Sequence, residues 1–165
     1  MINWLKENRA CKKGIDWCKE NCDTIQDVWD KLKRVDWLVW VATREGVLTD
    51  KELRLFACFC ARQNWHLLTD DRSRNAVEVA ERFAHGNATK EELKAAYVAA
   101  DAAYDAAYDA AYAAYAAVYD DAAYAAFDAA YAARVASSDD DDDDAGKEQM
   151  EWLRANTTPN FGGTK

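Results

Sequence analysis

The fold is decided by residues 94–136, which read KAAYVAADAAYDAAYDAAYAAYAAVYDDAAYAAFDAAYAARVA. Alanine supplies 23 of the 42 residues from 95 to 136, and all eight tyrosines of the chain lie in the same stretch. Alanine is the strongest helix former, and no proline or glycine interrupts the run. With one proline and six glycines in 165 residues, the chain is predicted to be an all-α, single-domain helical bundle with a long helix or helical hairpin.

Most of the tyrosines follow the helical repeat. At 100° per residue, one set falls within an arc of about 80° and forms a single stripe. This set is Tyr97, Tyr104, Tyr108, Tyr112, Tyr115 and Tyr119. The later aromatic residues Tyr124, Phe127 and Tyr131 are displaced around the axis, which favours a break near residues 120–121 and helices over 90–119 and 122–136. One curved helix across the whole stretch is the alternative.

Aspartates accompany the tyrosine stripe. Asp101, Asp105 and Asp109 recur every four residues beside it, and alanine covers the opposite side. Either tyrosine faces the core, or alanine packs inward and the Tyr/Asp face looks outward. A buried hydroxyl needs a hydrogen-bond partner, so we favour the outward face. The six tyrosines and three aspartates are therefore the candidate partner-binding surface, although an aromatic stripe is equally a sign of core packing.

The negative charge is concentrated in one region. Residues 95–144 contain twelve aspartates and one arginine, a net charge of −11, so the total of −9 leaves +2 for the remainder. Such a region repels nucleic acid, whose binding relies on lysine and arginine. It favours a basic protein partner instead.

The chain divides into four regions. Capping boxes at Thr49 to Glu52 and Thr89 to Glu92 mark helix starts, and six consecutive aspartates at 139–144 predict an unfolded segment. The predicted regions are a compact multi-helix part (1–93), the Ala/Tyr/Asp array (94–136), an acidic flexible linker (137–146), and a short helix with a tail (147–165).

A cytoplasmic location is expected. No window approaches the ~20 apolar residues of a membrane span, and no export signal is recognisable. The cysteine count of five is odd, which favours free thiols in a reducing compartment. Alanine-rich helix faces also allow association between copies of the chain.

Two further clusters are candidate binding sites. A zinc site is the alternative reading of Cys18, Cys22, Cys58, Cys60 and His66, but their spacing lacks a CxxC pair and cysteine commonly packs as a small core residue. We therefore predict no metal and no cofactor. Arg72, Arg74 and Trp65 form an alternative ligand site, with surface ion pairing as the simpler interpretation. No nucleophile and base stand at a diagnostic spacing, so no catalytic residue and no enzyme activity are predicted.

Residues 50–93 resemble a known family. The segments KELRLFA, WHLLTDDRS and AVEVAERFA, followed by the Thr89 capping box and an Ala-rich array, are similar to immunity proteins of bacterial polymorphic toxin systems, which also occur in phages. WLVWVATREGVLT and the closing PNF extend the resemblance to about half the chain. It implies a cytoplasmic protein that neutralises a toxin by direct binding, and it brings no catalytic residues.

Two functions therefore remain open. The first is an immunity-type inhibitor whose acidic, aromatic helical face covers a toxin or other basic enzyme. The second is a phage counter-defence protein, acting either as a nucleic-acid mimic through its aspartates or as a sponge for a nucleotide signal through Arg72, Arg74 and Trp65.

Overall fold

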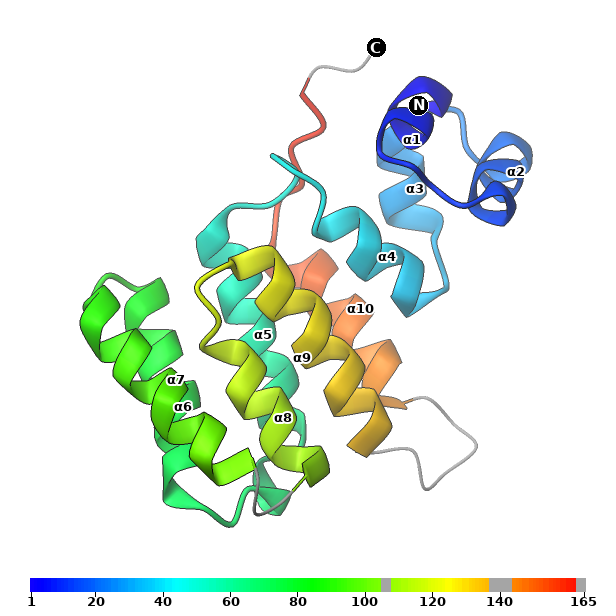
Figure 1. The fold of residues 1–165 in the computed structure, drawn as a ribbon. Coiled ribbons are helices and arrows are strands. Elements are labelled where there is room, and N and C mark those ends of the chain that lie inside the picture. Colours follow the sequence, from blue (N-terminus) through cyan, green and yellow to red (C-terminus); the bar gives the residue numbers. More distant parts are fainter. Residues whose placement is uncertain (105–107, 137–143, 163–165) are drawn as a thin grey trace.

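The computed structural model describes residues 1–104, 108–136 and 144–162, and the side chains of these residues except 104, 108–111 and 136. Within these ranges the chain forms ten α-helices, one short 3-10 helix and no strand (Figure 1), which confirms the predicted all-α, single-domain fold. The elements are α1 (Ile2–Glu7), α2 (Lys12–Asn21), α3 (Ile25–Lys31), α4 (Val35–Ala42), α5 (Asp50–Gln63), the 3-10 helix η1 (Trp65–Leu67), α6 (Asp71–Ala84), α7 (Lys90–Tyr104), α8 (Tyr108–Ala117), α9 (Ala122–Ala136) and α10 (Asp144–Asn156).

Helix α5 lies at the centre of the molecule, with α6, α8, α9 and α10 packed around it (Figure 1). Its first turn is fixed by a capping box. The Thr49 hydroxyl accepts a hydrogen bond from the Glu52 amide at 3.2 Å, and the Glu52 carboxylate accepts one from the Thr49 amide at 2.9 Å. The same arrangement between Thr89 and Glu92 begins α7. Both predicted capping boxes are therefore confirmed.

Helices α1 to α4 cover one end of the bundle (Figure 1), where aromatic rings hold distant segments together. The rings of Trp4 and Trp40 meet edge-on, with centroids 6.2 Å apart. The C-terminal segment returns to the same end: the Phe161 ring lies 6.1 Å from Trp4, and the Asn160 amide donates to the Val47 carbonyl at 2.8 Å. The segment that follows α10 is therefore packed onto the N-terminal helices.

The Ala/Tyr/Asp array breaks where its aromatic pattern shifts. Helix α8 ends at Ala117 and α9 begins at Ala122, which confirms the predicted break near residues 120–121. The Asp121 carboxylate accepts a hydrogen bond from the Tyr124 amide at 2.9 Å and so caps the first turn of α9. Helices α8 and α9 then pack against each other as a hairpin.

The predicted continuous helix over 90–119 is wrong. The ring centroids of Tyr97 and Tyr115 lie 4.9 Å apart, whereas eighteen residues along one helix would separate them by about 27 Å. Helices α7 and α8 are separate elements that pack against each other. The residues between them, 105–107, lie outside the described part of the chain.

Alanine lines the interior of these three helices. Because an alanine carries only a methyl group, two helices can approach closely along such a face. The fully buried alanines are Ala100, Ala103, Ala113, Ala114, Ala116, Ala117, Ala125, Ala126, Ala129 and Ala133. The predicted inward packing of alanine is thus confirmed. Association between copies through alanine-rich helix faces stays a prediction.

Buried polar side chains connect α5 and α10 to the alanine-rich helices. The Asn64 amide nitrogen donates to the Ala133 carbonyl at 2.9 Å, and Gln149 donates to the Ala130 carbonyl at 3.2 Å. Arg54, only 2% exposed, donates to the carbonyls of Ala117 at 3.0 Å and Asp120 at 2.9 Å. These bonds occupy carbonyls near the ends of α8 and α9 and fix how the smooth alanine surfaces sit against their neighbours.

The predicted regions are not separated at every boundary. Helix α7 begins at Lys90, as predicted, and runs through the boundary at residue 93, so the compact part and the array share one helix. The predicted linker to residue 146 is too long, because α10 already begins at Asp144; residues 137–143 lie outside the described part. Among the described helices, none has both the length and the apolar character needed to cross a membrane.

Candidate functional site

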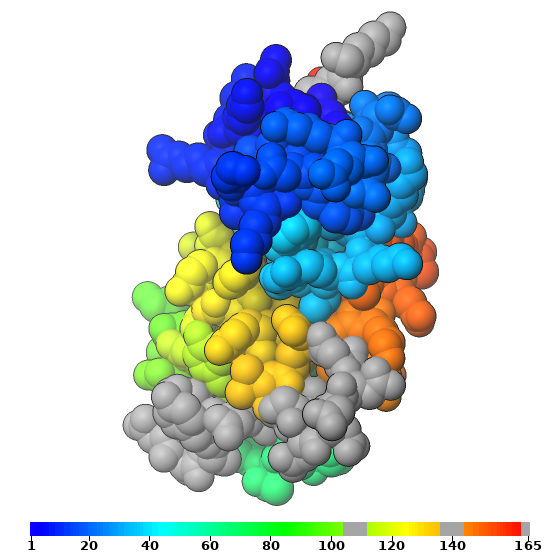
Figure 2. Space-filling view, turned by 90° about the vertical axis from the view of Figure 1, so that its right-hand side faces the viewer, coloured from blue at the N-terminus to red at the C-terminus, as the bar shows by residue number. Residues whose placement is uncertain are grey.

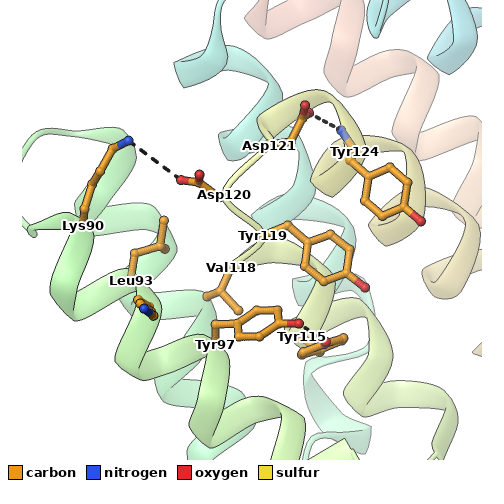
Figure 3. Close-up of a pocket in the computed structure, with 10 residues that line it drawn as sticks. Lys90, Leu93, Tyr97, Tyr115, Val118, Tyr119, Asp120, Asp121 and Tyr124 are labelled. Atoms are coloured by element: carbon orange, nitrogen blue, oxygen red, sulfur yellow. Dashed lines mark hydrogen bonds and ion pairs between the residues drawn. The ribbon is translucent and has the colours of Figure 1, made fainter.

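A cleft of about 760 Å³ opens between α7 and the turn that joins α8 to α9 (Figure 3). Four tyrosines, two lysines and two aspartates dominate its lining, so we call it the tyrosine cleft. Its residues are Lys90, Leu93, Lys94, Tyr97, Tyr115, Val118, Tyr119, Asp120, Asp121 and Tyr124.

The tyrosine rings form a continuous ladder along the cleft. Ring centroids lie 4.9 Å apart for Tyr97 and Tyr115, 5.1 Å for Tyr115 and Tyr119, and 5.4 Å for Tyr119 and Tyr124. The hydroxyls of Tyr97 and Tyr115 share a hydrogen bond of 2.5 Å, so each of these two hydroxyls has a polar partner (Figure 3). Such mutually packed rings have little rotational freedom and present a rigid aromatic wall.

Burial alters the acidity of the inner phenols. It raises the pKa of Tyr112, Tyr115 and Tyr119 above the ordinary tyrosine value, because the charged phenolate loses solvent. Neighbouring phenols and Asp128 add to these increases. The Tyr112 hydroxyl donates to the Asp128 carboxylate at 2.8 Å, an interaction that also favours the neutral phenol. Tyr112, Tyr115 and Tyr119 are therefore uncharged at neutral pH.

Opposite charges occupy the two edges of the cleft. Lys90 and Lys94 stand one helical turn apart on α7, and Asp120 and Asp121 stand on the facing turn. The Lys90 ammonium reaches to 3.9 Å from the Asp120 carboxylate across the opening (Figure 3). Because both side chains are largely exposed, this ion pair is weak and easily separated.

The turn that carries the two aspartates is held from inside the molecule. The two hydrogen bonds from Arg54 take up the carbonyls of Ala117 and Asp120. The amides of Val118 and Tyr119 donate to carbonyls three residues earlier, which tightens the end of α8. Asp120 and Tyr119 are thus placed by a well-bonded backbone.

Helix α9 presents a second surface next to the cleft. Tyr124, Phe127, Tyr131 and Val135 lie at helical spacing and are 59%, 43%, 63% and 45% exposed. We call these four residues the α9 stripe. Figure 2 looks onto this side, where atoms of α9, yellow to gold, lie uncovered below the blue N-terminal helices. A hollow of about 390 Å³ continues the stripe toward Trp40 and Arg44.

The predicted Tyr/Asp face is only partly reproduced. Tyr97, Tyr115 and Tyr119 do lie together, but they come from α7, α8 and the turn after α8 and meet at the cleft instead of forming one stripe. Tyr112 lies half-buried beside Tyr115, and Asp101 is exposed on α7. The remaining predicted side chains, those of Tyr104, Asp105, Tyr108 and Asp109, lie outside the described part.

Sequence reasoning missed two groups of residues. Lys90 and Lys94 share a face of α7 with Tyr97, a spacing that could have been read from the sequence. The α9 stripe was visible only as the displaced group Tyr124, Phe127 and Tyr131. The exposure of the stripe depends on which other helices cover α9, and the sequence pattern of α9 does not contain that information.

The alternative ligand site is engaged in internal contacts. Arg72 pairs with the Asp70 carboxylate at 2.7 Å, where Asp70 caps α6. The guanidinium groups of Arg62 and Arg74 lie 4.5 Å and 5.8 Å from the centre of the Trp65 ring. These contacts agree with the structural interpretation of the arginines.

The cysteines are core residues with one exception. Cys18, Cys22, Cys58 and Cys60 are buried and Cys11 is exposed, and all five thiols are free. Burial raises the pKa of Cys18 to about 11 and that of Cys58 to about 12. Within the described ranges, no three His, Cys, Asp or Glu side chains converge as metal ligands, so the alternative zinc site is not assembled there.

Comparison with known proteins identifies no relative. The chain matches no protein-family model, and no curated protein or solved structure is significantly similar to it. The resemblance of residues 50–93 to immunity proteins therefore remains an expectation, and the function is argued from the cleft and the stripe.

Proposed function

We propose that this chain is a non-catalytic binding protein of the immunity type, which neutralises a toxin or another basic protein by covering it with the α9 stripe. One observation carries the proposal. Of the six large hydrophobic side chains that are exposed among the described residues, four lie side by side on α9. Scattered exposed hydrophobics are normal, but a contiguous group on one helix marks an interaction surface.

The composition of the stripe suits protein recognition. Tyrosine and phenylalanine offer large contact areas with few rotatable bonds, so they lose little entropy on binding. Tyr124 is backed by Tyr119, which packs in turn against Tyr115, so the end of the stripe next to the cleft is rigid before a partner arrives. A rigid surface reduces the ordering cost of association.

Charge selects the partner. The exposed Asp120 and Asp121 adjoin the stripe at Tyr124, and the region 95–144 carries a net charge of −11. A basic protein is attracted to this side over a distance of about 10 Å at moderate salt. Its lysine or arginine side chains can also rest on the faces of exposed tyrosine rings.

A binding role also agrees with the state of the tyrosines. The raised pKa values of Tyr115 and Tyr119 keep these two side chains as neutral phenols, which are weak nucleophiles and weak bases at neutral pH. They supply surface and hydrogen bonds, and the proposal requires no chemical step from them.

The test is rescue of bacterial growth when the chain is co-expressed with basic toxins encoded beside its gene. The wild-type chain is expected to restore growth and to bind the purified toxin less tightly as salt is raised. Replacing Phe127 and Tyr131 together by glutamate should abolish rescue, because it places charge in the apolar contact, while the helical circular dichroism stays unchanged.

A matched control is available on α7. Val98 is 60% exposed and does not line the cleft, so Val98→Glu adds the same kind of charge elsewhere and should leave rescue intact. Full rescue by the Phe127 and Tyr131 double variant would overturn the proposal. So would a wild-type chain that binds none of the neighbouring gene products.

A further inference from the structure

Protein binding through the α9 stripe does not explain the size and the polar edges of the tyrosine cleft. Its volume of about 760 Å³ lies within the range of small-molecule sites, and its wall is a packed ladder of aromatic rings. A protein surface that only receives a partner's side chains has no requirement for lysines and aspartates at opposite edges. The arrangement calls for a ligand with two unlike ends.

The aromatic wall suits a flat ring. Tyr119 and Tyr124 lie 5.4 Å apart and tilt by 32°, so together they offer a broad, slightly curved platform (Figure 3). The 5.4 Å spacing leaves no room for a ring between them, so a ligand ring would stack on their outer side. Stacking of a nucleobase on an aromatic side chain contributes about 1–3 kcal/mol and tolerates every base.

The lysine edge suits a phosphate. Lys90 and Lys94 project from one face of α7, so both ammonium groups can approach the same anion. Lys94 forms no ion pair with any described residue, and Lys90 has only its weak, exposed contact with Asp120. Neither lysine would have to give up a strong interaction in order to bind a phosphate.

The carboxylate edge suits a base that carries an amino group. Asp121 uses Oδ1 to cap α9, and its other carboxylate oxygen is not engaged by that bond. The Asp120 carboxylate is 88% exposed, and among the described residues its one ion pair is the contact with Lys90 at 3.9 Å. Carboxylates accept hydrogen bonds from exocyclic amino groups and repel phosphate, so they set the direction in which such a ligand lies.

We infer that the tyrosine cleft binds a nucleotide, with its phosphate on Lys90 and Lys94 and its amino-bearing base stacked on Tyr119 and Tyr124 beside Asp120 and Asp121. This site goes beyond the proposed protein-binding surface, with which it shares Tyr124 and the two aspartates, because its lysine edge on α7 lies outside that surface. It also differs from the Arg72, Arg74 and Trp65 site considered for a nucleotide signal, which lies on α6 and η1 and shares no residue with the cleft.

The experiment is isothermal titration of the full chain with AMP, GMP, CMP, UMP, 3′,5′-cyclic AMP, adenosine and inorganic phosphate. The amino-bearing nucleotides should bind, with adenosine and phosphate alone at least tenfold weaker. Combining Lys90→Ala with Lys94→Ala should weaken nucleotide binding at least tenfold. Tyr124→Ala should do the same and Tyr124→Phe should not, because the phenylalanine ring preserves stacking.

The control removes two lysines elsewhere. Lys12 and Lys13 lie exposed on α2, so their replacement by alanine changes the net charge equally and should leave binding unchanged. Absence of binding by every nucleotide at millimolar concentration would overturn the inference. Equal binding of phosphate and AMP would overturn the nucleotide site, and equal binding of UMP and CMP would overturn the assignment of the aspartates. The Phe127 and Tyr131 double variant should still bind nucleotide, which separates this test from that of the proposed function.

Discussion

Among single residues, Arg54 stands out because it is a buried cation that donates its hydrogen bonds to backbone carbonyls. Burial lowers the pKa of its guanidinium, and the carbonyls of Ala117 and Asp120 provide partial negative charge at the end of α8. The Phe83 ring lies 5.4 Å from the guanidinium and covers it further. Arg54 therefore links the central helix to the turn that carries the cleft aspartates.

Replacing Arg54 by methionine is expected to lower the free energy of unfolding by about 2–4 kcal/mol. Methionine fills similar space but leaves two carbonyls without donors. Urea denaturation followed by circular dichroism measures the change. Arg72→Met serves as the control, since its exposed pair with Asp70 should contribute less than about 1 kcal/mol. Equal effects of the two substitutions would contradict the role given to Arg54.

The buried phenols make the fold sensitive to alkali. A pKa raised in the folded state above the unfolded value of about 10 means that the native state prefers the neutral phenol. This contribution to stability is complete below pH 10 and is lost as pH rises above it. Phenolate absorbance should therefore show Tyr112, Tyr115 and Tyr119 ionising late and together with the loss of helix.

The double variant Tyr115→Phe and Tyr119→Phe checks this assignment. It should remove two of the late-ionising groups from the absorbance change. If all tyrosines of the wild-type chain ionised together near pH 10 with the helical signal intact, the burial of these phenols in solution would be disproved.

Among the elements, α9 depends on alanine for its approach to α5 and α8. Ala129 is fully buried on this helix, so Ala129→Leu adds volume where no space exists. Overpacking of this kind typically costs about 1–3 kcal/mol, and a lower melting temperature in calorimetry would show it. Ala102 is exposed on α7, and Ala102→Leu should change the melting temperature little. Equal stability of the two variants would indicate a looser interface than the structure has.

The helix starts were predictable and one helix end was not. The boxes at Thr49 and Thr89 are local patterns, so sequence alone locates them. The break near residues 120–121 was visible because the aromatic pattern changes phase there. No such change in the sequence signals the separation of α7 from α8, because alanine, tyrosine and aspartate continue there at the same spacing. There the contact of Tyr97 with Tyr115 outweighs a local preference for continuous helix.

At the level of the whole molecule, the sequence predicts the chemical character of the site but not the full set of residues that form it. The tyrosines and aspartates of the array signalled a surface of mixed aromatic and acidic character. The cleft also needs Lys90 beside Asp120, a contact across thirty positions that exists only after α7 and α8 fold together. Periodicity describes one helix at a time and cannot supply a contact between helices.

The alanine interior has a consequence for how such a molecule can change. Methyl groups provide little directional packing, and a few amide and guanidinium hydrogen bonds from Arg54, Asn64 and Gln149 fix how α5 and α10 sit against α8 and α9. The exposed residues of the α9 stripe take no part in these bonds. For the proposed binding function, this means that single substitutions can change the recognition surface while the helices that carry it stay in place.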